Sequence, residues 1–210
     1  MTWFTTSSRA LEPFPASGHR SLALRALVTS LHPESRPEVL DLGPPLSGNL
    51  KFLSALHCRV RVADLQRSLA AEPLESRRKE AMPALVERLL PLAPDERFAA
   101  VLAWDVFDYL RADQVAALMA RLIPRLRRQA HVLVLVSTRP QIPAVPTPYR
   151  IVDAENLDLE TPAAHAGADP MRPCPRYRQS DLAQMMPGLS VSRCYLLRSG
   201  IQEYLLVYDV

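Results

Sequence analysis

Val39-Leu40-Asp41-Leu42-Gly43-Pro44-Pro45-Leu46-Ser47-Gly48-Asn49-Leu50 is the stretch around which the rest of the chain is arranged. Its first residues are apolar and predict a buried strand, a glycine turn follows, and a helix-like segment begins at Asn49. An acid at the end of a strand before a glycine turn is how many α/β proteins hold a nucleoside-containing ligand. Glycine lets the backbone approach the ligand, and the next helix presents unpaired N–H groups. The stretch therefore predicts a ligand site at a sheet edge.

Apolar segments of two kinds alternate on both sides of this stretch. Short runs rich in valine, leucine and alanine are typical of buried strands, whereas apolar residues at helical spacing indicate helices. The expected strands are Glu38–Leu42, Cys58–Leu65, Phe98–Trp104, Ala130–Val136, Leu189–Leu197 and Ile201–Tyr208. The expected helices are His19–Leu31, Asn49–Leu56, Ser68–Leu90 in two pieces, Asp113–Arg128 with Asp113 as N-cap, and Ser180–Met186. This alternation predicts a mostly parallel sheet with helices on both faces, closed by an antiparallel hairpin.

The length of 210 residues suits one domain, 1–210, with a sizeable core. Residues 1–37 are predicted to be an N-terminal extension and helix. Residues 139–178 are rich in proline and show little periodicity, and a loop of this length in a compact domain is commonly either functional or disordered. Because it follows a strand of the sheet, we expect it to lie over the carboxyl edge as a lid or substrate loop.

Composition narrows the class of protein. A net charge of +3 with 22% charged residues is too weak a basic balance to argue for nucleic acid. The three cysteines, Cys58, Cys174 and Cys194, are far apart and show no metal-ligand spacing, so we expect no metal site and a reducing, cytoplasmic location. No signal peptide and no apolar run of the roughly 18–20 residues that span a bilayer is visible, so we expect no membrane association.

A second acid follows the glycine turn at the sequence separation that is typical of nucleoside-binding folds. Asp64 lies 23 positions after Asp41, at the end of the strand predicted over Cys58–Leu65. An acid about 20 residues beyond the glycine turn can accept hydrogen bonds from both ribose hydroxyls of a nucleoside. The predicted cofactor-binding residues are Asp41, Gly43, Gly48, Asn49, Asp64, Leu65 and Trp104. For Asp41 the alternative is a local cap of the turn, and for Trp104 it is core packing.

Four segments together resemble the class I S-adenosylmethionine-dependent methyltransferases. Val39–Gly43 is similar to that family's first motif, and Val60–Leu65 is similar to its second strand, whose terminal acid holds the ribose. Phe98–Leu110 resembles its fourth strand with the short helix that follows, and the stretch from Tyr177 to Leu205 resembles its last helix and hairpin. The resemblance implies a Rossmann-like three-layer α/β/α sandwich with a seven-stranded, mostly parallel sheet. It also implies S-adenosylmethionine as cofactor and a small-molecule or protein methyl acceptor.

The sequence departs from the family pattern at three places. Pro44 and Pro45 stand where further glycines are usual, and proline lacks an N–H donor and fixes φ. No aspartate follows the segment Ala84–Leu90, where the family's third strand places an acid against the adenine. The motif Asn/Asp-Pro-Pro-Tyr of the enzymes that methylate amino groups of DNA bases or glutamine does not follow Trp104.

Candidate catalytic residues follow the predicted strand Phe98–Trp104. They are Asp105, Asp108 and Tyr109, and either acid could serve as a general base within hydrogen-bond reach of a substrate proton. The alternative for Asp105 is a helix N-cap. In the proline-rich segment, the candidates for gripping an anionic or aromatic substrate are Tyr149, Arg172, Arg176 and Tyr177, with a solvated arginine-rich cover as the alternative.

Methyl transfer is mainly a positioning task, so an absent catalytic signature does not exclude an enzyme. The leading interpretation is therefore a methyltransferase. The first rival is a non-catalytic protein that keeps the fold and binds a partner, which Pro44, Pro45 and the missing acid favour. The second rival is an NAD-dependent oxidoreductase, which the closing hairpin fits poorly. The sequence alone does not identify the acceptor or the oligomeric state.

Overall fold

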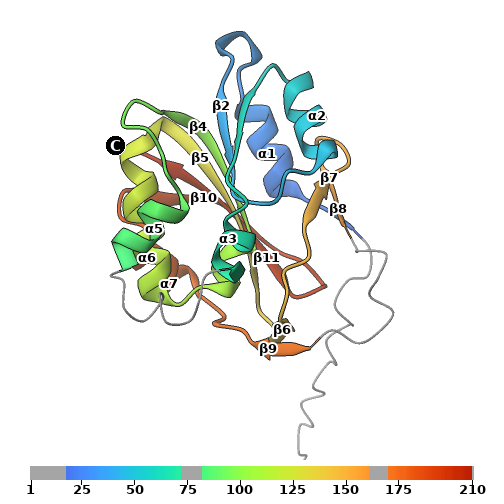
Figure 1. The fold of residues 1–210 in the computed structure, drawn as a ribbon. Helices are drawn as coiled ribbons and strands as arrows, with labels where there is room; N and C mark the ends of the chain where they lie inside the picture. Colours follow the sequence, from blue (N-terminus) through green and yellow to red (C-terminus); the bar gives the residue numbers. More distant parts are fainter. Residues whose placement is uncertain (1–17, 72–81, 161–169, 210) are drawn as a thin grey trace, which may run out of the picture.

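Six strands form the central sheet of the computed structural model, which describes residues 18–71, 82–160 and 170–209. The strands are β2 (Glu38–Asp41), β3 (Arg59–Val62), β4 (Phe98–Trp104), β5 (Leu126–Ser137), β10 (Leu189–Leu196) and β11 (Ile201–Tyr208), in the order β10-β11-β5-β4-β2-β3 (Figure 1). The strands β3, β2, β4 and β5 are parallel, and β11 pairs antiparallel with both β5 and β10. The predicted mostly parallel sheet with a closing antiparallel hairpin is confirmed.

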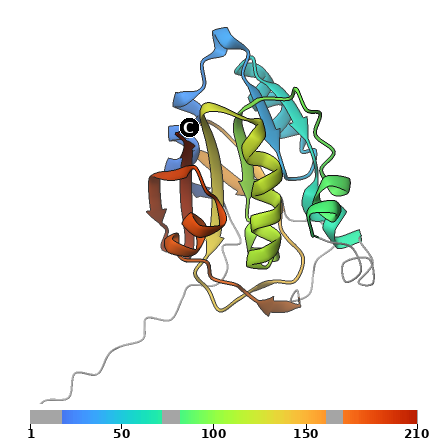
Figure 2. The ribbon, with the colours of Figure 1, turned by 90° about the vertical axis from the view of Figure 1, so that its left-hand side faces the viewer.

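Helices cover both faces of this sheet and give two apolar cores. On one face lie α1 (Leu22–Ser30) and α2 (Ser47–Ala55), and on the other α3 (Leu65–Ala71), α5 (Met82–Leu89), α6 (Ala112–Leu122) and α7 (Gln179–Met185) (Figures 1 and 2). Alternate residues of β4 explain the two cores: Ala100 and Leu102 pack with α1, whereas Val101 and Ala103 pack with α6. A strand buried on both faces reads as a continuous apolar run, as Phe98–Trp104 does.

The predicted seventh strand is absent from the described part of the chain. In place of the family's third strand, α5 is followed by a loop that contains Pro91 and Pro94, and proline cannot donate to a sheet ladder. This loop meets the edge strand β3 through side chains: the Arg61 guanidinium donates to the Pro91 carbonyl (2.6 Å) and pairs with Glu96 (3.0 Å). The seven-stranded prediction was therefore wrong by one edge strand, and β3 is the edge.

Several helix boundaries also differ from prediction. The helix expected over Asp113–Arg128 ends at Leu122, because Pro124 lies in a 3-10 turn, η3 (Ile123–Arg125), and β5 begins at Leu126. Its N-cap is Arg111 rather than Asp113, which lies in the first turn. The helix expected from His19 begins at Leu22, with Ser21 capping the Leu24 N–H at 3.1 Å. Two further 3-10 turns are η1 (Pro33–Ser35) and η2 (Val106–Tyr109).

The segment 139–178 carries more regular structure than its composition predicts. The strands β6 (Gln141–Pro143) and β9 (Met171–Pro173) form a two-stranded sheet. The strands β7 (Tyr149–Ile151) and β8 (Asn156–Leu159) join β1 (His19–Arg20) in a three-stranded sheet of order β1-β8-β7. The small sheet therefore joins the proline-rich segment to the N-terminal extension. The helices found in the described residues are all too short or too polar to cross a lipid bilayer.

A buried glutamate fixes the N-terminal extension to the central sheet. Glu203 of β11 is fully buried, with its Oε1 3.0 Å from His19 Nε2 and its Oε2 accepting the Ala23 N–H at 3.1 Å. An acid in an otherwise apolar strand costs free energy unless its oxygens are paired. Glu203 thus connects β11 with β1 and the first turn of α1.

Replacing Glu203→Ala should lower the free energy of unfolding by roughly 1–3 kcal/mol or more, because the buried Ala23 N–H and His19 lose their acceptors. Urea denaturation followed by circular dichroism measures this change. The matched control is Glu155→Ala, which removes partly exposed pairs with Arg20 and Arg25 and should cost about 1 kcal/mol or less. Equal losses in the two variants would contradict the role assigned to Glu203.

Candidate functional site

The glycine turn after β2 is organised by one buried carboxylate. Asp41 is 1% exposed, and its Oδ1 accepts the Gly43 N–H at 2.9 Å and the Trp104 indole N–H at 2.7 Å. Burial raises the pKa of Asp41, and the hydrogen bonds from Trp104 and Gly43 act in the opposite direction. The carboxylate therefore connects the ends of the neighbouring strands β2 and β4 and holds the turn between them.

The Trp104 indole takes the space that the glycine provides. A Cβ atom at Gly43 would lie 2.9 Å from Trp104 Cδ1 and Nε1, so a larger residue does not fit without displacing the ring. Trp104 has a left-handed φ of 50° and follows a register shift between β4 and β5. The ring is 2% exposed. In this conformation the close approach at Gly43 is made by an indole of the chain itself.

The strand β7 covers the turn and the start of α2. Asn49 Nδ2 donates to the Tyr149 carbonyl at 3.0 Å, and the Ile151 N–H donates to Asn49 Oδ1 at 2.7 Å. The Tyr149 ring stacks on Trp104 with centroids 5.8 Å apart and planes 11° apart. Beside them, a Cβ at Gly48 would lie 3.2 Å from Arg150 Cγ. Asn49 and Gly48, predicted to contact a cofactor, are both in contact with β7.

Asp64 is held next to the turn by the backbone. Its N–H donates to the Gly43 carbonyl at 3.1 Å, and its φ of 45° lies in the left-handed region. The next residue, Leu65, is buried, and its N–H donates to Leu42. Asp64 lines a cavity of about 310 Å³, which we call the outer cavity. Its other lining residues are Pro44, Pro45, Arg67, Val145, Pro146 and Pro148.

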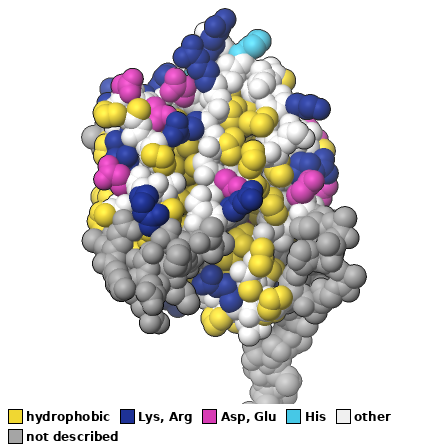
Figure 3. Space-filling view, viewed as in Figure 1, with side chains coloured by type: hydrophobic (Ala, Val, Ile, Leu, Met, Phe, Trp, Pro, Cys, Tyr) yellow, Lys and Arg dark blue, Asp and Glu magenta, His cyan; other side chains and the backbone are white. Residues whose placement is uncertain are grey.

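The outer cavity thus combines two charged residues, Asp64 and Arg67, with walls that are otherwise apolar. Its prolines come from the glycine turn on one side and from the segment before β7 on the other. In Figure 3, apolar side chains run down the middle of the face seen in Figure 1, with charged side chains between and beside them. Such a surface suits a ligand with a flat apolar part and hydroxyl groups.

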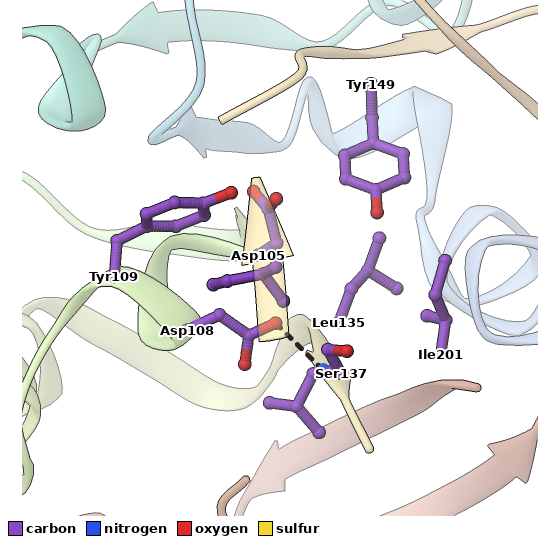
Figure 4. Close-up of a pocket in the computed structure, with 9 residues that line it drawn as sticks. Asp105, Asp108, Tyr109, Leu135, Ser137, Tyr149 and Ile201 are labelled. Carbon is purple, nitrogen blue, oxygen red and sulfur yellow. Dashed lines mark hydrogen bonds between the residues drawn. The ribbon is translucent and has the colours of Figure 1, made fainter. Parts of the chain in front are cut away.

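A second, smaller cavity lies where β4 and β5 end, and we call it the inner cavity. It measures about 10 Å³, the size of a single water-sized group, and is lined by Asp105, Asp108, Tyr109, Leu135, Val136, Ser137, Ile142, Tyr149 and Ile201. Figure 4 shows Asp105, Asp108 and Tyr109 on one side of it, facing Tyr149, Leu135 and Ile201. The three predicted catalytic candidates therefore lie together.

The chemistry of the inner cavity is that of a buried acid pair. Asp108 Oδ2 accepts the Ser137 N–H at 2.8 Å, and Oδ1 has no hydrogen-bond partner among the described residues. Burial, together with the charge of Asp105, raises the pKa of Asp108 to about 8. Burial and the same two acids raise the pKa of Tyr109, whose hydroxyl donates to the Pro143 carbonyl at 3.2 Å. An acid with a pKa near neutrality suits proton transfer.

The predicted substrate-loop residues separate into two groups. Tyr149 lines the inner cavity, and the Arg172 guanidinium lies 5.4 Å from the centroid of the Tyr109 ring. Tyr177 instead donates its hydroxyl to the Leu110 carbonyl at 2.7 Å, and Arg176 is an exposed residue with a left-handed φ of 57°. Neither of these two lines a cavity described above.

Sequence reasoning missed the residues that complete the walls. Val145, Pro146 and Pro148 carry no chemical signature, and their place opposite Pro44 and Pro45 follows only from the fold. Cys174, which in the sequence is only one of three widely spaced cysteines, lies near the acid pair, and burial and Asp108 raise its pKa to about 11.

Asp108→Asn should change the pH dependence of stability. The folded-state pKa of about 8 lies above the ordinary 3.8, so between these values the folded chain holds more protons than the unfolded chain. The free energy of unfolding of the unmodified protein therefore falls as pH rises from about 4 to about 8. Asparagine does not ionise and keeps an oxygen for the Ser137 N–H, so the variant should lose less stability over this window.

Urea denaturation at pH 5 and pH 8 measures the free energy of unfolding of both proteins. The difference between the variant and the unmodified protein should shift in favour of the variant at pH 8. The control is Asp95→Asn, a change at an exposed acid in the loop before β4. An identical pH dependence in Asp108→Asn and the unmodified protein would show that Asp108 is ionised in the folded state at neutral pH.

No family model and no curated protein sequence matches the chain. Solved structures do match it. An S-adenosylmethionine-dependent methyltransferase from Clostridium acetobutylicum is similar with a TM-score of 0.50 and 11% identity, over 90% of this chain and 92% of that chain. A structure described as the conversion of a disulfide bond into a thioacetal group during echinomycin biosynthesis has a TM-score of 0.51 and 13% identity, over 90% and 82% of the two chains. The chain therefore has the fold of the class I S-adenosylmethionine-dependent methyltransferases.

Proposed function

We propose that this protein is an S-adenosylmethionine-dependent methyltransferase that binds its cofactor at the edge formed by Asp41, Gly43 and Asp64. The observation that carries the proposal is the backbone hydrogen bond from Asp64 to Gly43, which places an acid and a glycine turn beside one cavity of about 310 Å³. The similar structure from Clostridium acetobutylicum is that of an S-adenosylmethionine-dependent methyltransferase, which supports the same cofactor class here.

The residues of the outer cavity fit the nucleoside half of this cofactor. A carboxylate such as Asp64 accepts hydrogen bonds from ribose hydroxyls, and proline rings and Val145 offer apolar surface to a base. The methionine half fits less well, because Trp104 and Tyr149 lie against the glycine turn and the start of α2. Binding of the whole cofactor therefore requires a rearrangement of these two rings.

The inner cavity supports the acceptor side of the proposal. Bound S-adenosylmethionine would supply an activated methyl group, and the chain would have to orient the acceptor and remove its proton. Asp105 and Asp108 are the acids placed at this position, and because burial raises the pKa of Asp108 to about 8, Asp108 would hold its proton at neutral pH and accept one only as the pH rises toward 8. Tyr109, with Arg172 over its ring, forms the adjoining wall. The acceptor class that this supports is a small molecule or an exposed protein side chain.

One observation favours a second function, that of a non-catalytic protein with the same fold. The Trp104 ring fills the space at Gly43, and the Asn49 amide is bonded to β7 through both its nitrogen and its oxygen. A chain that had lost the cofactor would tolerate such an arrangement permanently. The two functions differ in whether S-adenosylmethionine binds at all.

Calorimetric titration with S-adenosylmethionine and S-adenosylhomocysteine separates them. We expect binding in the micromolar range, weakened about tenfold or more in Asp64→Ala through the loss of charged hydrogen bonds to the ribose. Asp95→Ala, at an exposed acid before β4, should bind as the unmodified protein does. Absence of heat up to millimolar ligand would instead establish the non-catalytic interpretation. Where binding is found, release of S-adenosylhomocysteine with a panel of amines, phenols and peptides tests transfer.

A further inference from the structure

The strand β7 is held at the proposed cofactor edge by side-chain contacts and not by strand pairing. Both hydrogen-bonding atoms of the Asn49 amide are used on it, and Asn49 is 2% exposed. The Tyr149 ring, 4% exposed, stacks on Trp104 and meets the His19 ring edge-on with centroids 6.3 Å apart. In Figure 1, β7 lies beside the beginning of α2.

The backbone of β7 is paired elsewhere, within its own small sheet. Its ladder partner is β8, with Tyr149 opposite Leu159 and Ile151 opposite Leu157. The central sheet has no ladder hydrogen bond to β7 in the described residues. Displacing β7 from the edge therefore breaks side-chain contacts but leaves every strand of the central sheet paired. Opening at β7 would also take Tyr149 and Ile151 out of the apolar core that they share with α1 and α2, so the closed state is the dominant one.

The position of β7 divides the edge into two compartments. Val145, Pro146 and Pro148, just before β7, line the outer cavity with Asp64, whereas Tyr149 lines the inner cavity with Asp105 and Asp108. The Tyr149 ring of the inner cavity stacks on Trp104, which approaches Gly43 next to Pro44 and Pro45 of the outer cavity. A ligand that ends at the ribose needs only the outer cavity. A ligand with an amino-acid tail must continue past the glycine turn, where the rings and the Asn49 amide are.

We propose that β7 is an internal plug that selects ligands by length. With β7 in place the edge accepts a nucleoside without an amino-acid tail, and S-adenosylmethionine binds only after Tyr149 and Ile151 leave Trp104 and Asn49. This inference rests on the proposed function, because it concerns access to the same site. Asn49 acts as a positioning residue: it holds β7 closed and does not need to contact the ligand.

The proposal has a quantitative consequence. When only a fraction of the molecules is open, the apparent affinity for a ligand that needs the open state is reduced by that fraction. Weakening the plug raises the open fraction and strengthens binding of S-adenosylmethionine. The same change should affect adenosine binding much less, because adenosine contacts the segment before β7 (Val145, Pro146 and Pro148) and none of the residues that leave Trp104 and Asn49. The ratio of the affinity for S-adenosylmethionine to that for adenosine therefore measures how far β7 is open. A general loss of structure would lower both affinities together.

Asn49→Ala, titrated with S-adenosylmethionine and with adenosine, is the first experiment. Removing both hydrogen bonds to β7 should raise the affinity for S-adenosylmethionine roughly tenfold while adenosine stays within about twofold of the unmodified protein. The matched control is Asn156→Ala, which removes an amide of the neighbouring β8 whose side chain bonds Asp153 and not β7. It should leave the ratio unchanged.

A reversible lock keeps the proposal testable if Asn49→Ala does not fold. A Cβ at Gly48 faces Arg150 Cγ at 3.2 Å, so the double variant Gly48→Cys/Arg150→Cys places two thiols where a disulfide can form with β7 closed. The double variant also carries Cys194→Ser, which removes an exposed thiol. The oxidised form should bind adenosine but bind S-adenosylmethionine at least about tenfold more weakly than the reduced form.

Each outcome decides between the two proposals. If S-adenosylmethionine binds the oxidised and reduced forms equally, or Asn49→Ala weakens its binding, the plug is wrong and the cofactor assignment stands. If S-adenosylmethionine binds no form, including the reduced double variant and Asn49→Ala, the cofactor assignment fails and the plug fails with it. If the ratio of S-adenosylmethionine affinity to adenosine affinity rises in Asn49→Ala and falls on oxidation of the double variant, both the plug and the cofactor assignment are supported.

Discussion

The hydrogen bonds of the Asp41 carboxylate are the constraint on which the carboxyl edge of this protein depends. One oxygen accepts from the Gly43 backbone and from the Trp104 indole, and so joins the ends of β2 and β4. A buried carboxylate has to find donors, because an unpaired charge in the interior costs several kcal/mol. Here the donors come from the turn, from the next strand of the sheet and, through the Asn49 side chain, from α2. The position of the indole, and through it that of Tyr149, follows from this requirement.

The same constraint explains why one edge carries two separate cavities. In an open α/β sheet, ligands bind in the crevice beyond the carboxyl ends of the strands. The Trp104 ring, fixed by Asp41, lies in that crevice between the end of β3 and the end of β5. The apolar outer cavity with Asp64 remains on one side, and the acidic inner cavity with Asp108 remains on the other. A site that the fold makes continuous is divided by a single side chain and the ring stacked on it.

Much of this fold is predictable because its signals are local. The apolar runs of β4, β5 and β11 and the spacing from Asp41 to Asp64 each lie within one short segment, and they locate the sheet and its carboxyl edge. What the sequence does not reveal are pairings between distant segments. The Asn49 amide bonds to residues about a hundred positions away, and His19 meets Glu203 across nearly the whole chain. Neither pairing leaves a periodic pattern.

The number of strands in the sheet, six where seven were predicted, was wrong for a different reason. Counting strands from a family resemblance assumes that every element of the family persists. The region after α5 contains Pro91 and Pro94 and bonds to β3 through Arg61, so it fills the edge without pairing with it. The sequence did show the missing acid of that strand. The physical reason for its absence is that the strand which would carry the acid is replaced by a loop.

Pro44 and Pro45 determine where recognition can occur at this edge. A glycine-rich turn grips a ligand through backbone N–H groups, and proline has none to offer. The Leu46 N–H folds back to the Pro44 carbonyl at 2.8 Å, and the Gly43 N–H is taken by Asp41, so these amides are already paired within the chain. Of the groups of the turn, Pro44 and Pro45 line the outer cavity. Polar recognition has to come from Asp64 and Arg67, the two charged residues of the outer cavity. The turn has lost its amides on the side where the methionine end of the cofactor would lie and kept its acid on the nucleoside side.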